Sequence, residues 1–440
     1  MSRKAASRRS AVPEGRLARF VALGVLTGEV MVGVFAERFR QRGATAGGAL
    51  IQLSGRGAAR LAERLSHLRG AALKLGQLLS LEGGDLLPPE VAEALAILRA
   101  DAHTMPLAQL RRVLGREWGH GWERRFAHFD FEPIAAASIG QVHRARTADG
   151  RDLALKVQYP GIARSIDSDV DNVTALVRFA RLLPATFDVR TITAEAKRQL
   201  HQEADYLAEA RHLARYRRLV ADEPGLLVPR VHADLTTRRI LAMDYLEGEP
   251  LESLAADDIR PAERDAVGKL LERLLLRELF EFRFMQTDPN LANYLYDRGT
   301  KRIVLLDFGA VQAFPARLTE QYRRISAAIV AGDRRAVRAL AVEIGYAGAD
   351  EGEAAIEAIV DVIMLVCEPL RHRGAYDFGA SDLPARARTL GLDLAFRHGL
   401  MRAPPPETLF LHRKLAGAYL LCARLGARVN VRALVEPFLT

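Results

Sequence analysis

Three oxygen-bearing side chains stand at spacings suited to phosphoryl transfer. Asp288 is followed five residues later by Asn293, and Asp307 comes 14 residues after Asn293. Asp307 also ends a short apolar run, residues 303–306, that is typical of a buried strand. Phosphoryl transfer requires a carboxylate near the attacking group and oxygen ligands for Mg²⁺. We therefore expect Asp288 to be a catalytic residue, and Asn293 and Asp307 to bind magnesium.

A lysine inside an apolar strand suggests a contact with phosphate. Lys156 lies in the run Ala-Leu-Lys-Val, residues 154–157. An ammonium group in such a strand is costly unless an anion meets it, so Lys156 fits the strand lysine that contacts the α- and β-phosphates of ATP. The alternative is a lysine on an edge strand that reaches solvent. A helical carboxylate must hold a phosphate-binding lysine, and residues 191–220 offer four: Glu195, Glu203, Asp205 and Glu209.

The segment before Lys156 departs from the glycine-rich loop of protein kinases. In its place stand Ala135, Ala136, Ala137 and Ser138. Their backbone N–H groups could bind phosphate, but alanine restricts φ and prevents the close approach that glycine allows. Further along, residues 240–248 resemble a kinase hinge, where we expect backbone groups of Asp244 and Leu246 to bind adenine. The chain contains no Walker A sequence, which excludes a simple P-loop NTPase.

The catalytic loop also departs from that of protein kinases. Residues 285–288 read Met-Gln-Thr-Asp where His-Arg-Asp is usual, so Thr287 replaces the arginine that pairs with an activation-loop phosphate. No Ala-Pro-Glu follows Gly309. Phosphoryl-transfer chemistry is thus supported, whereas phosphorylation of protein substrates is not.

Element patterns predict an α+β, protein-kinase-like bilobal fold with an N-terminal helical extension. We expect a basic disordered tail at 1–19, helices at 20–125, a mostly β small lobe at 126–250 and a helical large lobe at 251–440. Within these parts, strands are expected at 129–131, 140–145, 153–157 and 228–246, and helices at 162–183 and 191–220. From Pro261 onward the chain is expected to be mostly helical, apart from residues 293–308.

Composition narrows the setting in which the protein acts. The 440 residues carry a formal charge of +9, which is compatible with anionic partners such as nucleotides or acidic lipids. With only Cys367 and Cys422, no disulfide framework can form, which indicates a reducing compartment. The apolar window from Phe20 to Phe35 is too short for a membrane span and predicts an amphipathic helix at a membrane surface.

Four motifs in order resemble the UbiB family of atypical kinases, the aarF-domain-containing proteins, over about residues 20–435. They are Lys74-Leu75-Gly76-Gln77, the alanine-rich segment, Glu203-Ala204-Asp205, and residues 284–290 with Asn293, the last as in the coenzyme Q biosynthesis kinases. The resemblance implies that the helix of Lys74, Gly76 and Gln77 folds over the active site, where Lys74 pairs with Glu203 and Asp205 and blocks protein substrates. It also implies that Glu209 is the partner of Lys156.

The resemblance implies a Mg²⁺-dependent kinase or ATPase that binds ATP or ADP and supports ubiquinone or isoprenoid-lipid metabolism. Expected partners are anionic membrane lipid or a quinone precursor, and biosynthetic enzymes, but not nucleic acid. The expected location is the cytoplasm, with peripheral association to the inner membrane. Two alternatives remain open at this point: a nucleotide-binding pseudokinase scaffold that lacks turnover, and a small-molecule kinase.

Overall fold

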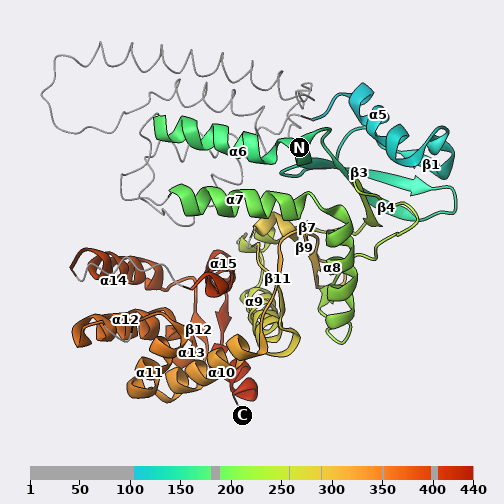
Figure 1. Cartoon of the computed structure of the whole chain (residues 1–440). Coiled ribbons are helices and arrows are strands. Elements are labelled where there is room, and N and C mark those ends of the chain that lie inside the picture. Colours follow the sequence, from blue (N-terminus) through green and yellow to red (C-terminus); the bar gives the residue numbers. More distant parts are fainter. Residues whose placement is uncertain are drawn as a thin grey trace, which may run out of the picture. The chain divides into compact units, whose positions relative to one another are not determined.

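The computed structural model describes residues 104–179, 189–256, 258–288, 290–348, 351–397 and 405–439. The predicted tail and the part of the helical extension that holds Lys74, Gly76 and Gln77 lie outside these residues. The chain divides into two compact units. The first comprises residues up to Ala214 together with Pro229–Leu246, and the second comprises Arg215–Val228 and Glu247 onward. Helix and strand labels follow Figure 1.

The first unit is built on an antiparallel sheet of five strands (Figure 1). Its order is β1-β3-β4-β6, and β2 also pairs with β3. The bounds are Phe126–Phe129 for β1, Ala135–Ala136 for β2, Gly140–Thr147 for β3, Asp152–Gln158 for β4 and Ile240–Asp244 for β6. A turn with Gly150 at φ +91° joins β3 to β4, as the Ala-Asp-Gly sequence there favours. The strands expected at 140–145 and 153–157 are therefore present, whereas the strand expected at 129–131 lies earlier, at Phe126–Phe129.

Helices surround this sheet, and one predicted helix is in fact two. The elements are α5 (Leu107–Trp118), a 3₁₀ turn at Trp122–Arg125, α6 (Ile162–Phe179), α7 (Val189–Glu203) and α8 (Tyr206–Leu219). Helices α6 and α7 lie side by side (Figure 1). The prediction of one helix over 191–220 was wrong because the chain breaks at Ala204 and Asp205. Asp205 Oδ1 accepts a hydrogen bond from Ala208 N at 2.9 Å, so Asp205 starts a new helix as its N-cap.

The second unit contains more strands than expected. A four-stranded sheet runs in the order β5-β10-β9-β7, and β8 and β11 form a separate pair, as do β12 and β13. The bounds are Leu226–Leu227 (β5), Glu249–Pro250 (β7), Phe284–Gln286 (β8), Tyr294–Asp297 (β9), Arg302–Leu305 (β10), Val311–Ala313 (β11), Tyr376–Asp377 (β12) and Arg428–Val429 (β13). The chain beyond Pro261 is mostly helical as expected, but the short strands β8, β11, β12 and β13 were not foreseen, because strands of two or three residues are too short to show a period.

Helices supply the rest of the second unit. They are α9 (Pro261–Arg277), a π-helical turn (Glu278–Phe282), α10 (Ala316–Ala331), α11 (Arg334–Ile344), α12 (Glu353–Val366), α13 (Glu368–Arg371), α14 (Leu383–Arg397), α15 (Pro406–Leu425) and α16 (Val431–Val435). Short 3₁₀ turns cover Leu251–Ala255, Leu291–Asn293 and Glu436–Phe438. Buried leucine and isoleucine side chains from α9, α10, α11 and α15 contribute to one core cluster.

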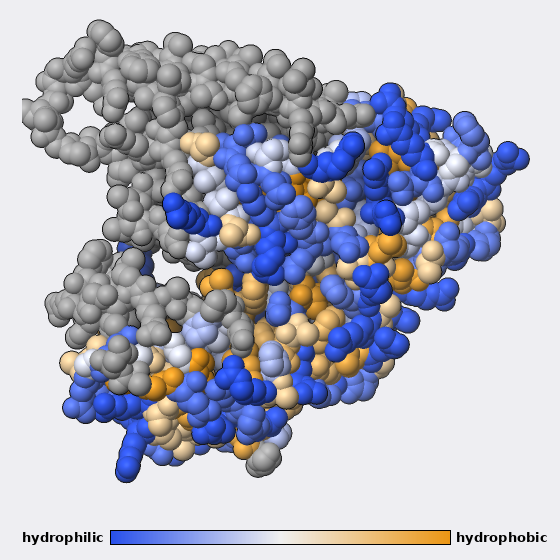
Figure 2. All heavy atoms as spheres, viewed as in Figure 1, coloured by the Kyte–Doolittle hydropathy of each residue, from blue (hydrophilic) through white to orange (hydrophobic). Residues whose placement is uncertain are grey.

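The surface of the described residues is mainly polar. Hydrophilic residues dominate the face shown in Figure 2, and hydrophobic residues appear there in small groups. Within the described ranges, five large apolar side chains are exposed: Leu107, Ile134, Val366, Leu415 and Leu420. Among the helices that can be assessed, none has the length and apolar character to cross a bilayer. Cys367 and Cys422 are both free thiols.

Candidate active site

Lys156 lies in the middle of the first unit's sheet and is paired with a buried carboxylate. Strand β4 is flanked by β3 and β6, so Lys156 is not on an edge strand, and its side chain is 8% exposed. Its Nζ lies 2.8 Å from Oε1 and 3.0 Å from Oε2 of Glu209, whose side chain is fully buried. Leu155 and Val157 point to the opposite face, into the apolar core. The alternative of a solvent-reaching edge lysine is thereby excluded.

The four helical carboxylates that were candidate partners of Lys156 have different contacts in the structure. Glu209, in the first turn of α8, meets the lysine, as the resemblance implied. Glu195 is bound to Arg198 on its own helix at 2.8 Å, and Asp205 caps α8. Glu203 accepts a hydrogen bond from the Ser138 hydroxyl. Glu203 at the end of α7 therefore contacts the alanine-rich segment directly.

The alanine-rich segment is a tight hairpin rather than an open loop. Ala135 and Ala136 form β2 and pair with Val142 and Gln141. Ala137 N donates to Gly140 O at 2.9 Å, so this N–H is already used and is not open to phosphate in this conformation. Our expectation of a row of available alanine N–H donors therefore needs correction at Ala137, because the β-turn consumes its donor.

Gly140, at the end of this hairpin, is closely enclosed. A β-carbon at this position would stand 2.5 Å from the backbone oxygen of Val157 and 2.8 Å from the Tyr206 hydroxyl. A neighbouring strand cannot move aside as a flexible side chain can, so the position requires glycine. The hairpin is thus pressed against β4 one residue from Lys156.

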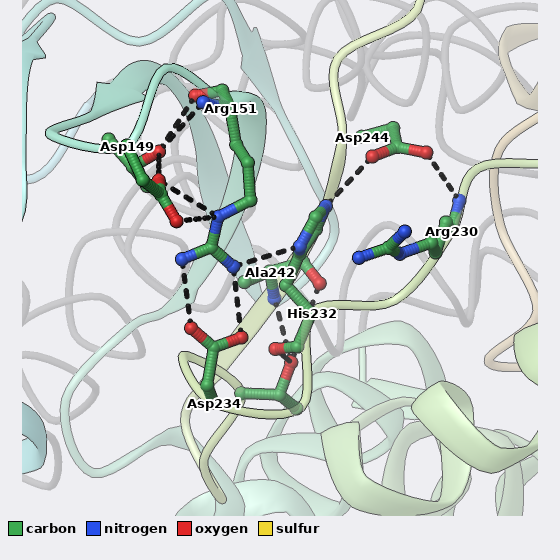
Figure 3. Close-up of polar contacts among 9 residues, drawn as sticks. Asp149, Arg151, Arg230, His232, Asp234, Ala242 and Asp244 are labelled. Carbon is green, nitrogen blue, oxygen red and sulfur yellow. Dashed lines mark hydrogen bonds and ion pairs between the residues drawn. The ribbon is translucent and has the colours of Figure 1, made fainter.

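A chain of polar contacts that the sequence did not reveal holds the end of β6 (Figure 3). Asp244 accepts hydrogen bonds from His232 Nε2 at 2.8 Å and from Arg230 N at 3.1 Å. Arg151 reaches between Asp234 and His232, with its Nη1 at 3.1 Å from His232 Nδ1 and from Asp234 Oδ1. Because arginine can only donate, Nδ1 accepts and the hydrogen of the neutral ring is on Nε2. This series of polar contacts therefore orients the Asp244 carboxylate.

The backbone N–H groups of Asp244 and Tyr245 point to opposite sides of the chain. Tyr245 N donates to Asp152 O of β4 at 2.9 Å, whereas Asp244 N donates to Arg230 O at 3.0 Å. Successive residues in an extended chain direct their polar groups to opposite sides in this way. The expected adenine contacts of Asp244 and Leu246 stay a prediction.

In the second unit the three residues with which the sequence analysis began come together. Asn293 Nδ2 donates to Asp288 Oδ2 at 3.4 Å, and the Asn293 carbonyl accepts from Leu306 N at 3.0 Å, next to Asp307. Asp307 follows β10, and its Oδ1 accepts from Gly309 N at 2.9 Å in a tight turn. Backbone and side-chain bonds thus connect the loop after β8 to the end of β10.

The donor set of these residues fits magnesium. Mg²⁺ prefers oxygen ligands and usually takes only one or two from protein, with phosphate and water completing its shell. Asn293 turns its amide nitrogen toward Asp288, so its amide oxygen faces the other way. Within the described ranges no cluster of three or more histidine, cysteine or acidic side chains could hold a metal by itself. A site that shares its ion with a nucleotide needs no such cluster.

A second set of residues escaped the sequence analysis. Lys414, in α15, is buried and contacts Glu278, Gln286 and Tyr294 beneath the loop that carries Asp288. Sequence patterns could not suggest these contacts, because Lys414 is 128 residues from Gln286 and lies in an ordinary amphipathic helix. The predicted pairing of Lys74 with Glu203 and Asp205 stays a prediction, since Lys74 lies outside the described residues.

Comparison with known proteins finds relatives over nearly the whole chain. Residues 97–341 match the ABC1 atypical kinase-like domain. The chain is 39% identical over 438 residues to the mitochondrial atypical kinase COQ8B of Rattus norvegicus, covering 98% of this chain and 81% of that protein. It is 36% identical over 432 residues to the mitochondrial atypical kinase COQ8 of Saccharomyces cerevisiae, covering 97% and 85%.

A solved structure is also similar to this chain. The complex of Rv3197 with erythromycin from Mycobacterium tuberculosis superposes with a TM-score of 0.58 at 25% identity, covering 87% of this chain and 95% of that one. The α+β, protein-kinase-like fold expected from the sequence is thereby confirmed. The chain belongs to the ABC1 (UbiB/AarF) family of atypical kinases, and it is therefore an enzyme of the kinase and ATPase class.

Proposed function

We propose that this enzyme binds ATP with Mg²⁺ and acts on, or is stimulated by, a quinone precursor or related isoprenoid lipid at a membrane surface. The observation that carries the proposal is the buried pair of Lys156 and Glu209 in a central strand. Such a lysine is held ready for an anion and is not an isolated structural charge. The names of the COQ8 relatives support a place in coenzyme Q biosynthesis.

Each residue has a role in this proposal. Lys156, positioned by Glu209, contacts the α- and β-phosphates, and backbone groups of Asp244 and Leu246 bind adenine. Asp288 orients the attacking group or accepts its proton. Asn293 and Asp307 would hold Mg²⁺, which supplies neutralisation of the phosphate charge.

The access route is the second part of the proposal. Lys74, Gly76 and Gln77 form the segment that excludes protein substrates, with Glu203 and Asp205 as the charged partners of Lys74. Ser138, through its bond to Glu203, links that contact to the alanine-rich hairpin. A small phenol or lipid head group, or water, is then the acceptor.

The test compares Asp307→Asn with Asp258→Asn, an exposed carboxylate of the same unit. Nucleotide binding is followed with a fluorescent ATP analogue at varied Mg²⁺. Phosphate release is followed in a single turnover with phosphatidylglycerol vesicles, phosphatidylcholine vesicles or a prenylated phenol. We expect Asp307→Asn to abolish Mg²⁺-dependent binding and release, while Asp258→Asn retains both.

The outcomes separate the open alternatives. If Asp307→Asn leaves binding and release unchanged, the catalytic assignment is wrong. Binding without release under every condition would identify a nucleotide-binding scaffold. Transfer of phosphate to the phenol itself would identify a small-molecule kinase, whereas stimulation by anionic vesicles alone would identify a lipid-activated ATPase.

A further inference from the structure

Lys414 is a charged side chain in the interior of the second unit. Its side chain is 7% exposed, and its Nζ lies 3.1 Å from Glu278 Oε2, 3.2 Å from Gln286 Oε1 and 3.3 Å from the Tyr294 hydroxyl. An ammonium group has three N–H donors, and here three oxygens surround it. Lys414 thus donates hydrogen bonds to Gln286 and Tyr294 and is paired in charge with Glu278.

Glu278 extends the network to the start of the catalytic segment. Its Oε1 accepts from the Tyr216 hydroxyl at 2.8 Å and from the backbone N–H of Gln286 at 2.9 Å. Glu278 begins the π-helical turn that follows α9, and Arg283 leaves that turn with φ +49°. π-Helical turns are rare and occur frequently at functional sites, and a non-glycine residue at positive φ is uncommon. The chain therefore takes an irregular path that delivers Glu278 to the backbone of Gln286.

From Gln286 and Tyr294 the contacts reach the residues proposed for chemistry. Gln286 Nε2 donates to the carbonyl of Asp288 at 2.8 Å, and the Tyr294 hydroxyl lies 3.4 Å from Gln286 Oε1. Tyr294 directly follows Asn293. The network therefore contacts both ends of the segment that carries Asp288 and Asn293. A small cavity lined by Gln286, Tyr294 and Lys414 is also lined by Asn293 and Asp307.

The surroundings of Lys414 favour its charged form. Burial by itself would lower the pKa of Lys414, but the attraction of Glu278 and Tyr294 outweighs it and raises the pKa above its ordinary value. Stability alone is a weak reason for such a pair, because apolar residues of equal volume often stabilise a core as well or better. A buried charge that is held by one ion pair and two hydrogen bonds does, however, define one geometry.

We propose that Lys414 is a positioning residue that holds Asp288 and Asn293 in place through Gln286 and Tyr294, with Glu278 as its counter-ion. The inference rests on the proposed function, in which Asp288 and Asn293 serve phosphoryl transfer. Lys414 acts through these residues and touches neither nucleotide nor metal. Displacement of a catalytic group by about 1 Å can lower a rate by about 100-fold.

The test uses the full chain with Lys414→Met, the double variant Lys414→Met/Glu278→Gln, and Lys269→Met as an exposed-lysine control on α9. In Lys414→Met we expect single-turnover phosphate release to fall by about 10- to 100-fold and the Mg²⁺ requirement to rise. ATP affinity at saturating Mg²⁺ should change less than threefold, because the nucleotide-contacting Lys156 is untouched. The double variant should recover the unfolding midpoint, since no charge is left unpaired, but not the rate.

Two results would overturn the inference. One is a double variant that regains both the midpoint and the rate, which would make the network purely structural. The other is hydrogen exchange at residues 286–294 that is as slow in Lys414→Met as in the wild type. The exchange measurement does not depend on enzyme activity, so it tests the role of Lys414 even if the wild type releases no phosphate. A wild type that releases no phosphate would count against the proposed function and not against this inference.

Discussion

Removal of one member of the Lys156–Glu209 pair should destabilise the first unit strongly, while removal of both should not. The two side chains are 8% and 0% exposed, so removal of either one takes a close counter-charge away from a buried charge. Breaking a buried pair from one side costs about 3–5 kcal/mol, whereas a neutral replacement of both partners is often tolerated. We therefore expect Lys156→Met and Glu209→Gln each to cost about 3–5 kcal/mol, and the double variant to cost about 1–2 kcal/mol.

The two tryptophans make this measurement specific to the first unit. Trp118 and Trp122 are the only tryptophans of the chain, both lie in the first unit, and both are buried. Their fluorescence during urea unfolding therefore reports this unit without interference from the second. Lys197→Met is the matched control, because Lys197 forms an ion pair with the exposed Asp171. Such a surface pair contributes only about 0–1 kcal/mol.

Acidity provides a further check on the same variants. In Lys156→Met the buried Glu209 loses its lysine partner and can reduce its desolvation cost by taking up a proton, because burial favours the neutral acid. The penalty of Lys156→Met should therefore be smaller at pH 5 than at pH 8. ATP binding should be lost in both Lys156→Met and the double variant, although the latter is stable. Equal costs for Lys156→Met and Lys197→Met, or additive costs in the double variant, would refute the reasoning.

Three other outcomes follow from the geometry. His232→Ala removes the side chain that donates a hydrogen bond to Asp244, and it should weaken ATP binding roughly 3- to 10-fold. It should also reduce the preference for ATP over GTP, as measured by competition binding. An unchanged preference would show that this contact does not take part in adenine recognition. Gly140→Ala places a methyl group against the backbone of β4 and should cost about 1–3 kcal/mol in the tryptophan-monitored unfolding of the first unit, whereas Gly115→Ala, which meets nothing, should not. Burial raises the pKa of Glu272 from 4.5 to about 7, so the folded state binds its proton more tightly than the unfolded chain. The free energy of unfolding should then fall by about 3 kcal/mol as pH rises from 4.5 to 7 and stay level above, and Glu272→Gln should remove this slope in thermal unfolding of the second unit.

Features that depend on local pattern could be predicted from the sequence. The strands around Lys156 alternate or run apolar, and the turn before β4 contains glycine, so the strands and the lysine were placed correctly. The break between α7 and α8 was missed because the apolar spacing continues across it. Asp205 was the residue that could have indicated the break, because aspartate is a preferred N-cap and a new helix starts directly after it. The continuous helical spacing of apolar residues favoured a single helix instead.

The contacts that support the site could not be predicted in the same way. His232 and Arg151 meet near Asp244 only because β4, β6 and the segment before β6 come together in space. Lys414 reaches Gln286 across 128 residues. Neither contact leaves a spacing or a periodicity in the sequence, since hydrogen bonds between distant side chains depend on tertiary packing alone.

Some site residues could be predicted and the contacts that support others could not, because Lys156 and the pair of Asp288 and Asn293 are held in place in different ways. Lys156 stands in a regular strand whose backbone is fixed by pairing on both sides, so its position needs little from remote side chains. Asp288 and Asn293, the residues proposed for chemistry, lie between β8 and β9, where the described residues form one 3₁₀ turn and no strand. Backbone bonds hold this segment at a few points, and the network of Glu278 and Lys414 is the proposed source of the remaining positioning. Where a catalytic residue lies on irregular chain, the residues that position it are consequently those that sequence patterns conceal.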